Sequence, residues 1–456
     1  MHYSLTINVQ ILPRVYYIFT LYLSMIIILQ QIFFIAVASG AFWLFYRKAK
    51  SIYAMIQSGK PENRSDNPSA RLKNMLLLAF GQKKMFRNMI PAVLHLFIYT
   101  AFAITQIELI EIFIDGIAGI HRFFWNVVPL GGFYTFVIST IEILSLLALV
   151  ATLAFLSRRN LLKVPRFWTR EMTQWPRTDA NLILLGEMLL ITGIFSMNTA
   201  DMALHNNQYG FAVSGLLSPL LTGTSPETLH VIERFGWWLH CLVVFGFIAY
   251  LPYSKHLHIF LAFPNAYFAD LSPIKGQMKH MPRIEQEIRL MLGQPVENPD
   301  EQPVRFGAKD VQDLSWKSLL DAFSCTECGR CTAACPANQT GKLLSPRKIM
   351  MDTRDRMETL IAGQKLINPD FDDGKSLLHD YISVEELRAC TSCNACVEEC
   401  PVSINPLNII LELRRYLILE ESNSPEEWNL MFNNIETNAA VWKMSAMDRA
   451  NWAKEV

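Results

Sequence analysis

Charged residues are scarce in this chain of 456 residues, where Asp, Glu, Lys and Arg make up 18% against about 25% in soluble domains. An excess of either sign is also missing, since 41 basic residues balance 41 acidic ones. This balance excludes a uniformly basic nucleic-acid binder and an acidic disordered chain. No G-x-G-x-x-G or P-loop motif is present, which excludes nucleotide or flavin binding through those motifs.

The zero net charge conceals two regions of different composition. Residues 1–264 carry 20 basic and 12 acidic side chains, a net charge of +8, whereas residues 265–456 carry 21 and 29, a net charge of −8. Eight of the nine cysteines lie between Cys325 and Cys400, with cofactor spacing rather than that of a disulfide framework. Cys241 lies in the apolar half and is expected to be a small core residue.

Five long apolar stretches occur in the first region, each long enough to cross a bilayer as a helix. A helix is required there because lipid offers no partners to backbone N–H and C=O groups. The first stretch is too long and too late for a cleavable signal peptide, so we interpret it as an uncleaved span, with translation starting at Met1 or Met25. The stretches run over Leu23–Tyr46, Met89–Ile114, Phe133–Leu156, Asn181–Leu204 and Phe235–Phe263.

Basic residues gather in two of the loops between these stretches, and such loops stay on the cytoplasmic side of a membrane. Segment 47–87 has ten Lys or Arg residues and segment 158–177 has six, whereas loop 115–131 has only Arg122 and loop 205–233 has none. The sequence therefore predicts a multi-pass protein of the cell inner (cytoplasmic) membrane. Its amino terminus is expected outside and everything after Lys255 in the cytoplasm.

Three histidines lie in or near the apolar stretches: His95 in the second, His240 in the fifth and His258 near the end of the fifth. His240 and His258 are 18 residues apart, so in a continuous helix they would share one face with about 27 Å between them. This spacing suits two haems in opposite leaflets, each taking its second imidazole from another helix. In the same continuous helix His256 would point away from the face of His240 and His258. The alternative is that His240 hydrogen-bonds a neighbouring helix and that His256 and His258 both lie at the interface.

The sequence around these histidines is Glu-Arg-Phe-Gly-Trp-Trp-Leu-His over 233–240 and Leu-Pro-Tyr-Ser-Lys-His-Leu-His-Ile-Phe over 251–260. It resembles the fifth helix of the gamma-type cytochrome b subunit of respiratory nitrate reductase, and of the related membrane subunit of heterodisulfide reductases. The resemblance implies five spans, an outward amino terminus and b haems held by histidines of the second and fifth helices. His240 and His258 stand where that family has its fifth-helix ligands.

The chain departs from that family at the second helix, which has His95 but Thr105 where nitrate reductase members have a histidine ten residues later. His95 lies near the cytoplasmic end of its stretch, so we expect it to pair with His258 and hold one haem b. A second haem b, on His240, is left open, as is the absence of haem there. The other histidines that could pair with His240 are His121, His205 and His230.

Four acidic residues also lie in or at the edges of the apolar stretches. Carboxylates there can carry protons for a quinol site, and they can equally cap helices or lie at the outer interface. The four residues are Glu108, Glu111, Glu187 and Asp201.

Two cysteine runs in the second region share the spacing C-x2-C-x2-C-x3-C-P. Thiolates at such short intervals converge on one iron–sulfur cubane, and the fourth cysteine of each run turns to the other cluster. A zinc site would instead take two C-x-x-C pairs or mixed histidine ligands. We therefore assign one 4Fe-4S cluster to Cys325, Cys328, Cys331 and Cys400, and the other to Cys390, Cys393, Cys396 and Cys335.

Helices are expected around both runs, because Ser345 and Ser383 are suitable caps and β-branched alternation is scarce. The region resembles the helical dicluster ferredoxin domain of heterodisulfide reductase subunits, anaerobic glycerol-3-phosphate dehydrogenase and succinate dehydrogenase. In related fused proteins a domain with paired Cys-Cys-Gly motifs follows, but no cysteine follows Cys400 here. The resemblance then implies a separate Cys-Cys-Gly subunit, or an electron-transferring flavoprotein, as the soluble partner. The acidic tail would dock that partner or pack on its own domain.

The sequence thus predicts an all-α protein: a five-span transmembrane helical bundle of cytochrome b type over 1–264, a linker over 265–316, a cytoplasmic 2×[4Fe-4S] ferredoxin domain over 317–410 and a helical tail over 411–456. Its predicted function is that of an electron-transfer subunit of an oxidoreductase complex. Electrons would pass between the membrane quinone pool, haem b, the two clusters and the soluble partner, with no nucleic acid involved. The alternative is a membrane-tethered ferredoxin without haem, serving only as anchor and relay for a partner enzyme.

Overall fold

The computed structural model describes residues 11–128, 130–205, 209–271, 281–296, 305–368 and 370–454. Within these ranges the chain forms helices and turns without a strand, which confirms the predicted all-α class. The chain divides into two compact units, with boundaries after Ile52, Phe80 and Phe260. We call residues 1–52 and 81–260 the membrane unit, and residues 53–80 and 261–456 the cysteine unit.

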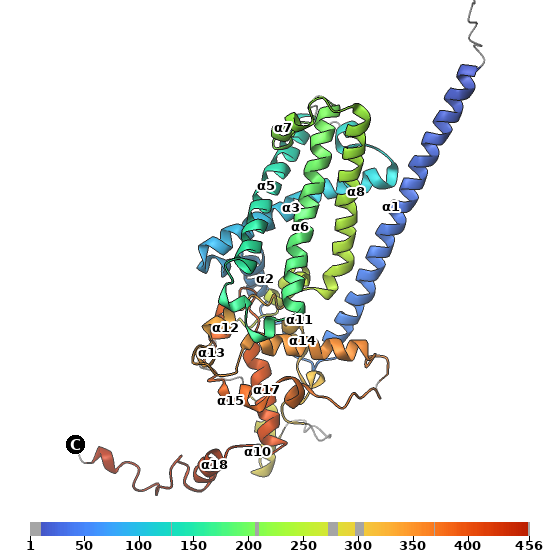
Figure 1. Ribbon diagram of the computed structural model, residues 1–456. Coiled ribbons are helices and arrows are strands. Elements are labelled where there is room, and N and C mark those ends of the chain that lie inside the picture. Colours follow the sequence, from blue (N-terminus) through green and yellow to red (C-terminus); the bar gives the residue numbers. More distant parts are fainter. Residues whose placement is uncertain are drawn as a thin grey trace, which may run out of the picture. The chain divides into compact units, whose positions relative to one another are not determined.

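Five helices are long and apolar enough to cross a membrane, as predicted. Phe133 and Phe136 on one of them are 63% and 66% exposed, and apolar side chains on the outside are expected of helices that face lipid. Met1, one of the two candidate translation starts, lies outside the described residues. The five helices are α1 (Ile11–Gln57), α3 (Met89–Ala118), α5 (Gly132–Asn160), α6 (Trp175–Leu204) and α8 (Pro226–Tyr250) (Figure 1).

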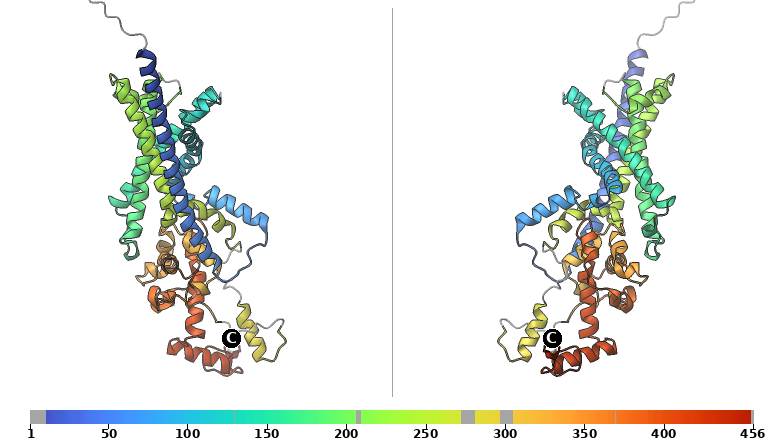
Figure 2. Two further views of the ribbon diagram at one scale, coloured as in Figure 1. Left: turned by 90° about the vertical axis from the view of Figure 1, so that its right-hand side faces the viewer. Right: turned by 90° about the vertical axis from the view of Figure 1, so that its left-hand side faces the viewer.

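Helices α6 and α8 approach each other closely because glycines lie where they cross. A Cβ atom on Gly236 would lie 2.6 Å from the backbone nitrogen of Met197, and one on Gly193 would lie 3.0 Å from that of His240. Small residues let helix backbones come together in a bilayer, where packing drives association. Phe34 of α1 packs against Ile112 of α3 and against Trp237, Cys241 and Phe245 of α8 in one buried core. Figure 2 shows the helices of both units from two further sides.

The fifth span is not one continuous helix. α8 ends at Tyr250, 3-10 turns cover residues 251–253 and 255–257, and α9 (His258–Tyr267) follows. Pro252 supplies no backbone N–H for a helix, and Ser254 adopts an extended backbone from which the second turn begins.

This break corrects the predicted arrangement of the histidines. His240 and His258 lie on different helices, so the shared face expected from 18 continuous helical residues is wrong. His256, expected to point away from His258, instead stacks on it with ring centroids 5.8 Å apart and planes at 25°. The periodicity argument assumes a regular helix through Pro252, and proline prevents that regularity.

The cysteine unit includes the segment 53–80 from the loop after the first span. The backbone nitrogen of Lys60 donates to the carbonyl of Leu314 at 2.8 Å, and that of Trp316 donates to the carbonyl of Lys60 at 3.1 Å. The Trp316 indole donates to the carbonyl of Glu62 at 2.9 Å. Gly59 permits this approach, because a Cβ atom there would lie 2.6 Å from the Trp316 backbone nitrogen.

The structure therefore divides the chain differently from the predicted boundaries at residues 264 and 316. Part of the first basic loop folds with the cysteine runs, and so does the beginning of the predicted linker. Asn265 in that linker is fully buried, accepting from Lys317 at 3.0 Å and donating to the carbonyl of Val402 at 2.9 Å. The linker also holds α10 (Pro282–Met291), while residues 272–280 and 297–304 lie outside the described ranges.

Helices surround both cysteine runs, and two of them begin at the predicted caps. The Ser345 hydroxyl accepts from the backbone nitrogen of Lys348, and Ser383 forms a capping box with Glu386. The helices are α11 (Trp316–Phe323), α12 (Arg330–Ala334), α13 (Pro336–Gln339), α14 (Pro346–Ala362), α15 (Val384–Ala389), α16 (Ala395–Glu399) and α17 (Pro406–Leu419), and the tail adds α18 (Glu426–Asn438). The remaining short helices are α2 (Pro68–Met75), α4 (Phe123–Asn126) and α7 (Ser214–Leu217).

Candidate cofactor sites

The first cysteine run curls because its backbone turns twice into the left-handed region. Glu327 has φ 55° and Gly329 has φ 73°, and α12 then carries Cys331. Cys335 ends α12 with an extended backbone, and Pro336 begins the next helix directly after it. Because the chain turns at both points, the thiols of the run can converge, while the last cysteine is held by the proline that follows it.

The second run repeats this backbone. Ser392 and Asn394 stand at the same two places of the motif, with φ 55° and φ 62°. Cys400 has φ −71° and ψ 121°, against −75° and 118° at Cys335. Asparagine tolerates the left-handed region better than most side chains, so it can stand where the first run has glycine. The shared spacing thus corresponds to a shared loop structure.

The fourth cysteine of each run lies with the other run. Burial raises the pKa of Cys400 to about 12, and the nearby thiols of Cys328 and Cys325 add to the rise. Burial also raises the pKa of Cys396 to about 12, with contributions from its own run and from Cys335. Helices α12 and α16 pack together and so bring the runs side by side. This grouping supports the two proposed ligand sets.

The chemistry of these thiols fits iron–sulfur clusters. A buried thiol whose pKa is near 12 keeps its proton at neutral pH unless a metal ion replaces it. Thiolate is the ligand type that holds the four irons of a 4Fe-4S cubane.

The two cysteine quartets have different surroundings. Cys325 of the first quartet is buried, whereas Cys393 of the second is exposed. Arg354 is ion-paired with Glu327 at 2.6 Å and is close enough to Cys325 to act on it electrostatically. Arg414 donates to the backbone carbonyl of Cys390 in the second run. Each quartet thus has a partly buried cation beside it.

Two of the histidines predicted to bind haem come together in the membrane unit. His95 and His258 are close enough to interact electrostatically. Nδ1 of His95 lies 3.1 Å from Oε1 of Gln82, and Nδ1 of His258 lies 2.9 Å from the carbonyl oxygen of Lys255. An imidazole that donates from Nδ1 to an oxygen has its Nε2 lone pair available for a metal. These two imidazoles are therefore of the ligand type that would hold a haem iron.

His240 lies at the contact between α6 and α8. It is buried, and its Nδ1 lies 3.4 Å from the carbonyl oxygen of Leu190. This contact matches the alternative in which His240 hydrogen-bonds a neighbouring helix. Of the three histidines considered as its haem partners, His230 is exposed and the other two contact Asp201.

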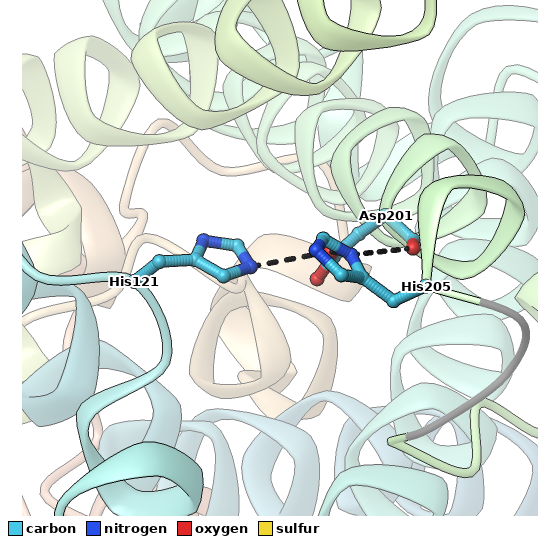
Figure 3. Close-up of side chains that lie close together, drawn as sticks. All are labelled: His121, Asp201 and His205. Carbon is cyan, nitrogen blue, oxygen red and sulfur yellow. Dashed lines mark hydrogen bonds and ion pairs between the residues drawn. The ribbon is translucent and has the colours of Figure 1, made fainter. Parts of the chain in front are cut away.

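His121 and His205 converge on Asp201 (Figure 3). Oδ1 of Asp201 lies 3.2 Å from Nε2 of His121 and 2.7 Å from Nδ1 of His205, and the two imidazole rings stack with centroids 5.5 Å apart. Oδ2 of the same carboxylate accepts from Nε of Arg122 at 3.1 Å. Asp201 is fully buried, while the two histidines are each about one-third exposed.

Arg122 is the centre of a buried polar cluster that the sequence patterns did not predict. Besides Asp201, its guanidinium donates to Glu108 at 3.3 Å and to Asn198 at 2.6 Å. Asn198 donates in turn to Glu142 at 3.2 Å. One sequence signal could have found it: Arg122 is the only basic residue in a loop between two apolar stretches. Glu187, the remaining predicted carboxylate, lies apart and accepts from the hydroxyl of Thr152 at 3.0 Å.

Residues 324–404 match the family model of the 4Fe-4S dicluster domain. The chain contains such a domain. All eight cysteines of the two runs lie inside the match. The match confirms the predicted 4Fe-4S domain, and the five apolar helices agree with a membrane protein.

The chain is 26% identical to the probable iron-sulfur-binding oxidoreductase FadF of Bacillus subtilis, over 95% of this chain and 62% of that protein. It is 28% identical to the EtfAB:quinone oxidoreductase of Syntrophomonas wolfei, over 86% and 55%. It is 35% identical to one of the subunits of a CoB-CoM heterodisulfide reductase from Methanosarcina acetivorans, over 24% and 53%. The chain spans little more than half the length of the first two proteins. No solved structure matches.

Proposed function

We propose that this chain passes electrons between a quinone in the membrane and a soluble redox protein, using two 4Fe-4S clusters and one haem b. The observation that carries the proposal is the crossed arrangement of the cysteine runs, in which Cys335 and Cys400 each lie with the other run. Two clusters held in this way are close enough to exchange electrons, and a purely structural role would not need two of them.

The residues of the chain would bind and orient these groups. The two cysteine quartets hold the clusters, and the left-handed turns at Gly329 and Asn394 shape the loops around them. His95 and His258 would hold the haem iron through Nε2, with Nδ1 facing the Gln82 side chain in one case and a backbone carbonyl in the other. When bound, haem and clusters accept and release one electron at a time at potentials that ligands and burial set.

The composition of the cysteine unit supports its location on the cytoplasmic side of the membrane. Segment 53–80, part of the most basic loop, folds with the cysteine runs, so both belong on one side of the membrane. Basic loops stay in the cytoplasm, so the soluble redox partner is expected there. The relative from Syntrophomonas is named for EtfAB and quinone, which favours an electron-transferring flavoprotein as the partner of this chain too.

The experiment is to purify the full chain anaerobically in detergent and to record its iron and sulfide content and its dithionite-reduced spectrum. We expect about eight irons and eight sulfides in clusters and a b-type α-band from one haem per chain. His95→Ala should abolish the α-band, while the exposed His230→Ala should leave it unchanged. An unmodified protein with full cluster content but no α-band would favour the haem-free membrane-tethered ferredoxin. Absence of cluster iron would contradict the proposal altogether.

A further inference from the structure

Five carboxylates and one guanidinium are buried together where the loops after α3 and α6 meet the helices of the membrane unit. Loop charges predict that these loops face the outside. Buried charges in a membrane protein must pair or hold protons, because the surroundings do not solvate them. The group comprises Glu108, Glu111, Asp115, Glu142, Asp201 and Arg122, each at most 8% exposed.

Three of the carboxylates serve the structure of the loops. Glu111 accepts from the backbone nitrogen of Phe124 and from the Tyr134 hydroxyl, both at 2.8 Å. Asp115 accepts from the backbone nitrogens of the loop after α3, at 2.9 and 3.0 Å. Glu142 accepts from backbone nitrogens and a hydroxyl of the loop after α6. Their oxygens are therefore satisfied, and they tie the loops to the helices.

Glu108 differs from these three. Its Oε1 accepts one long bond, 3.3 Å, from Nη1 of Arg122. Its Oε2 is buried and has no hydrogen-bond partner among the described residues. Asp201 has the shorter contact with Arg122, 3.1 Å, and also contacts two histidines, so it is the better counter-ion of the two. Glu108 is only 2% exposed, and buried polar atoms are almost always hydrogen-bonded. Its Oε2 is therefore a suitable site for a ligand that forms a hydrogen bond.

The position of Glu108 on α3 suits a ligand that enters from lipid. Ile104, one turn before Glu108 and therefore on the same side of α3, is 38% exposed, so this side of the helix borders the bilayer one turn away from Glu108. Glu108 also lies 13 residues after His95 on the same helix, a rise of about 20 Å. A ligand at Glu108 would therefore lie in the other half of the membrane from His95.

We propose that Glu108 binds the head group of a quinone and exchanges a proton with it. Quinone, two electrons and two protons form quinol; the electrons come from or go to the redox groups of the proposed function, on which this inference rests. Glu108 transfers one of the two protons, between its Oε2 and a quinone oxygen. The second proton exchanges with the aqueous phase, which His121 and His205 border. Arg122 does not relay protons, because guanidinium does not deprotonate in proteins, and instead holds Glu108 and Asp201 in place.

The test compares Glu108→Gln with Glu187→Gln in the full chain, purified anaerobically in lipid nanodiscs. Glutamine keeps the shape and a hydrogen-bonding group but carries no transferable proton. Menadiol is the quinol probe, and cluster reduction is followed by its optical bleaching. We expect Glu108→Gln to slow reduction by menadiol about a hundredfold, as for loss of a general base, and to leave reduction by dithionite unchanged. Glu187→Gln, whose carboxyl contacts Thr152 elsewhere in the unit, should match the unaltered chain.

Two outcomes separate the inference from the proposed function. If menadiol fails to reduce the clusters of the unaltered chain while dithionite succeeds, the quinone function fails. If menadiol reduces them and Glu108→Gln is as fast as the unaltered chain, the function stands and the assignment of Glu108 is wrong.

An infrared measurement needs no folded variant. Adding menadione to the unaltered chain should shift the C=O stretching band of a protonated carboxyl group, and no shift would overturn the proposal. Unchanged cluster iron would show that Glu108→Gln folds. The infrared spectrum of this variant should then lack the carboxyl C=O band that shifts in the unaltered chain.

Discussion

The two cysteine runs have the same spacing and nearly the same backbone, yet the protein surrounds them differently. Each quartet has one buried ligand, Cys325 or Cys335, but only the second quartet also has an exposed one, Cys393. The Arg354–Glu327 ion pair lies beside the first quartet. The motif therefore determines how the ligands converge, while burial and nearby charge are set by the helices packed around each run. Because burial and charge tune an iron–sulfur cluster, two identical motifs can serve as two different electron carriers.

The largest difference is expected when one ligand is removed from each quartet. Cys325→Ser and Cys393→Ser should each reduce cluster iron from about eight to about four per chain. Cys325→Ser should also reduce the helical circular dichroism signal, because Cys325 is buried and a serine without iron leaves a polar group unsatisfied there. Cys393→Ser should keep the helical signal, since its site is open to solvent.

The matched control is Cys241→Ser in the membrane unit, which should keep all of the cluster iron. Full iron content in either quartet variant would show that the ligand sets are wrong. Equal loss of helical signal in both would show that the difference in burial has no energetic consequence.

A smaller effect, on the reduction potentials of the clusters, is expected when the arginine beside each quartet is replaced. Arg354→Gln should lower the reduction potential of the cluster at Cys325, because an added electron then lacks a nearby positive charge. Arg414→Gln should do the same to the cluster at Cys390. We expect shifts on the order of tens of millivolts, larger for Arg354, since solvent and salt screen charges more strongly around the quartet that contains the exposed Cys393.

An anaerobic redox titration followed by electron paramagnetic resonance measures both potentials in one sample. Arg388→Gln, which removes a cation that contacts Asn423, serves as the control and should move neither potential. A larger shift in Arg414→Gln than in Arg354→Gln would reverse the comparison.

The smallest effect is expected at the two helix caps. Ser345→Ala and Ser383→Ala each remove an acceptor from a helix start, which costs about 1 kcal/mol of folding free energy. Ser345 also lies 2.8 Å from the hydroxyl of Thr332 in the first run, so its loss should cost more. Guanidinium unfolding of the cluster-loaded chain, followed by circular dichroism, measures both changes. A larger loss in Ser383→Ala would contradict this order.

Local signals in the sequence predicted much of the molecule. The five spans, the all-α class and the dicluster domain depend on length, hydropathy and cysteine spacing, which neighbouring residues determine. The end of α8 was missed because the apolar run continues through Pro252, although the proline itself was a signal for a break. The joining of Lys60 with Trp316 and the cluster around Arg122 depend on segments far apart in the chain, which no local pattern encodes.

The discontinuous cysteine unit has a consequence for how the protein is made. Segment 53–80 leaves the ribosome early, and 180 residues separate it from residue 261, where the rest of the unit begins. During synthesis this segment stays at the membrane surface while four further spans are inserted. Gly59 can pack against Trp316 only after that residue has been made. Cluster assembly can follow only when Cys400 has emerged, because each quartet takes a ligand from both runs under the proposed assignment. Insertion of the membrane unit therefore precedes loading of the clusters, and a nascent chain stalled in the membrane would carry an unfinished and oxidation-sensitive set of thiols.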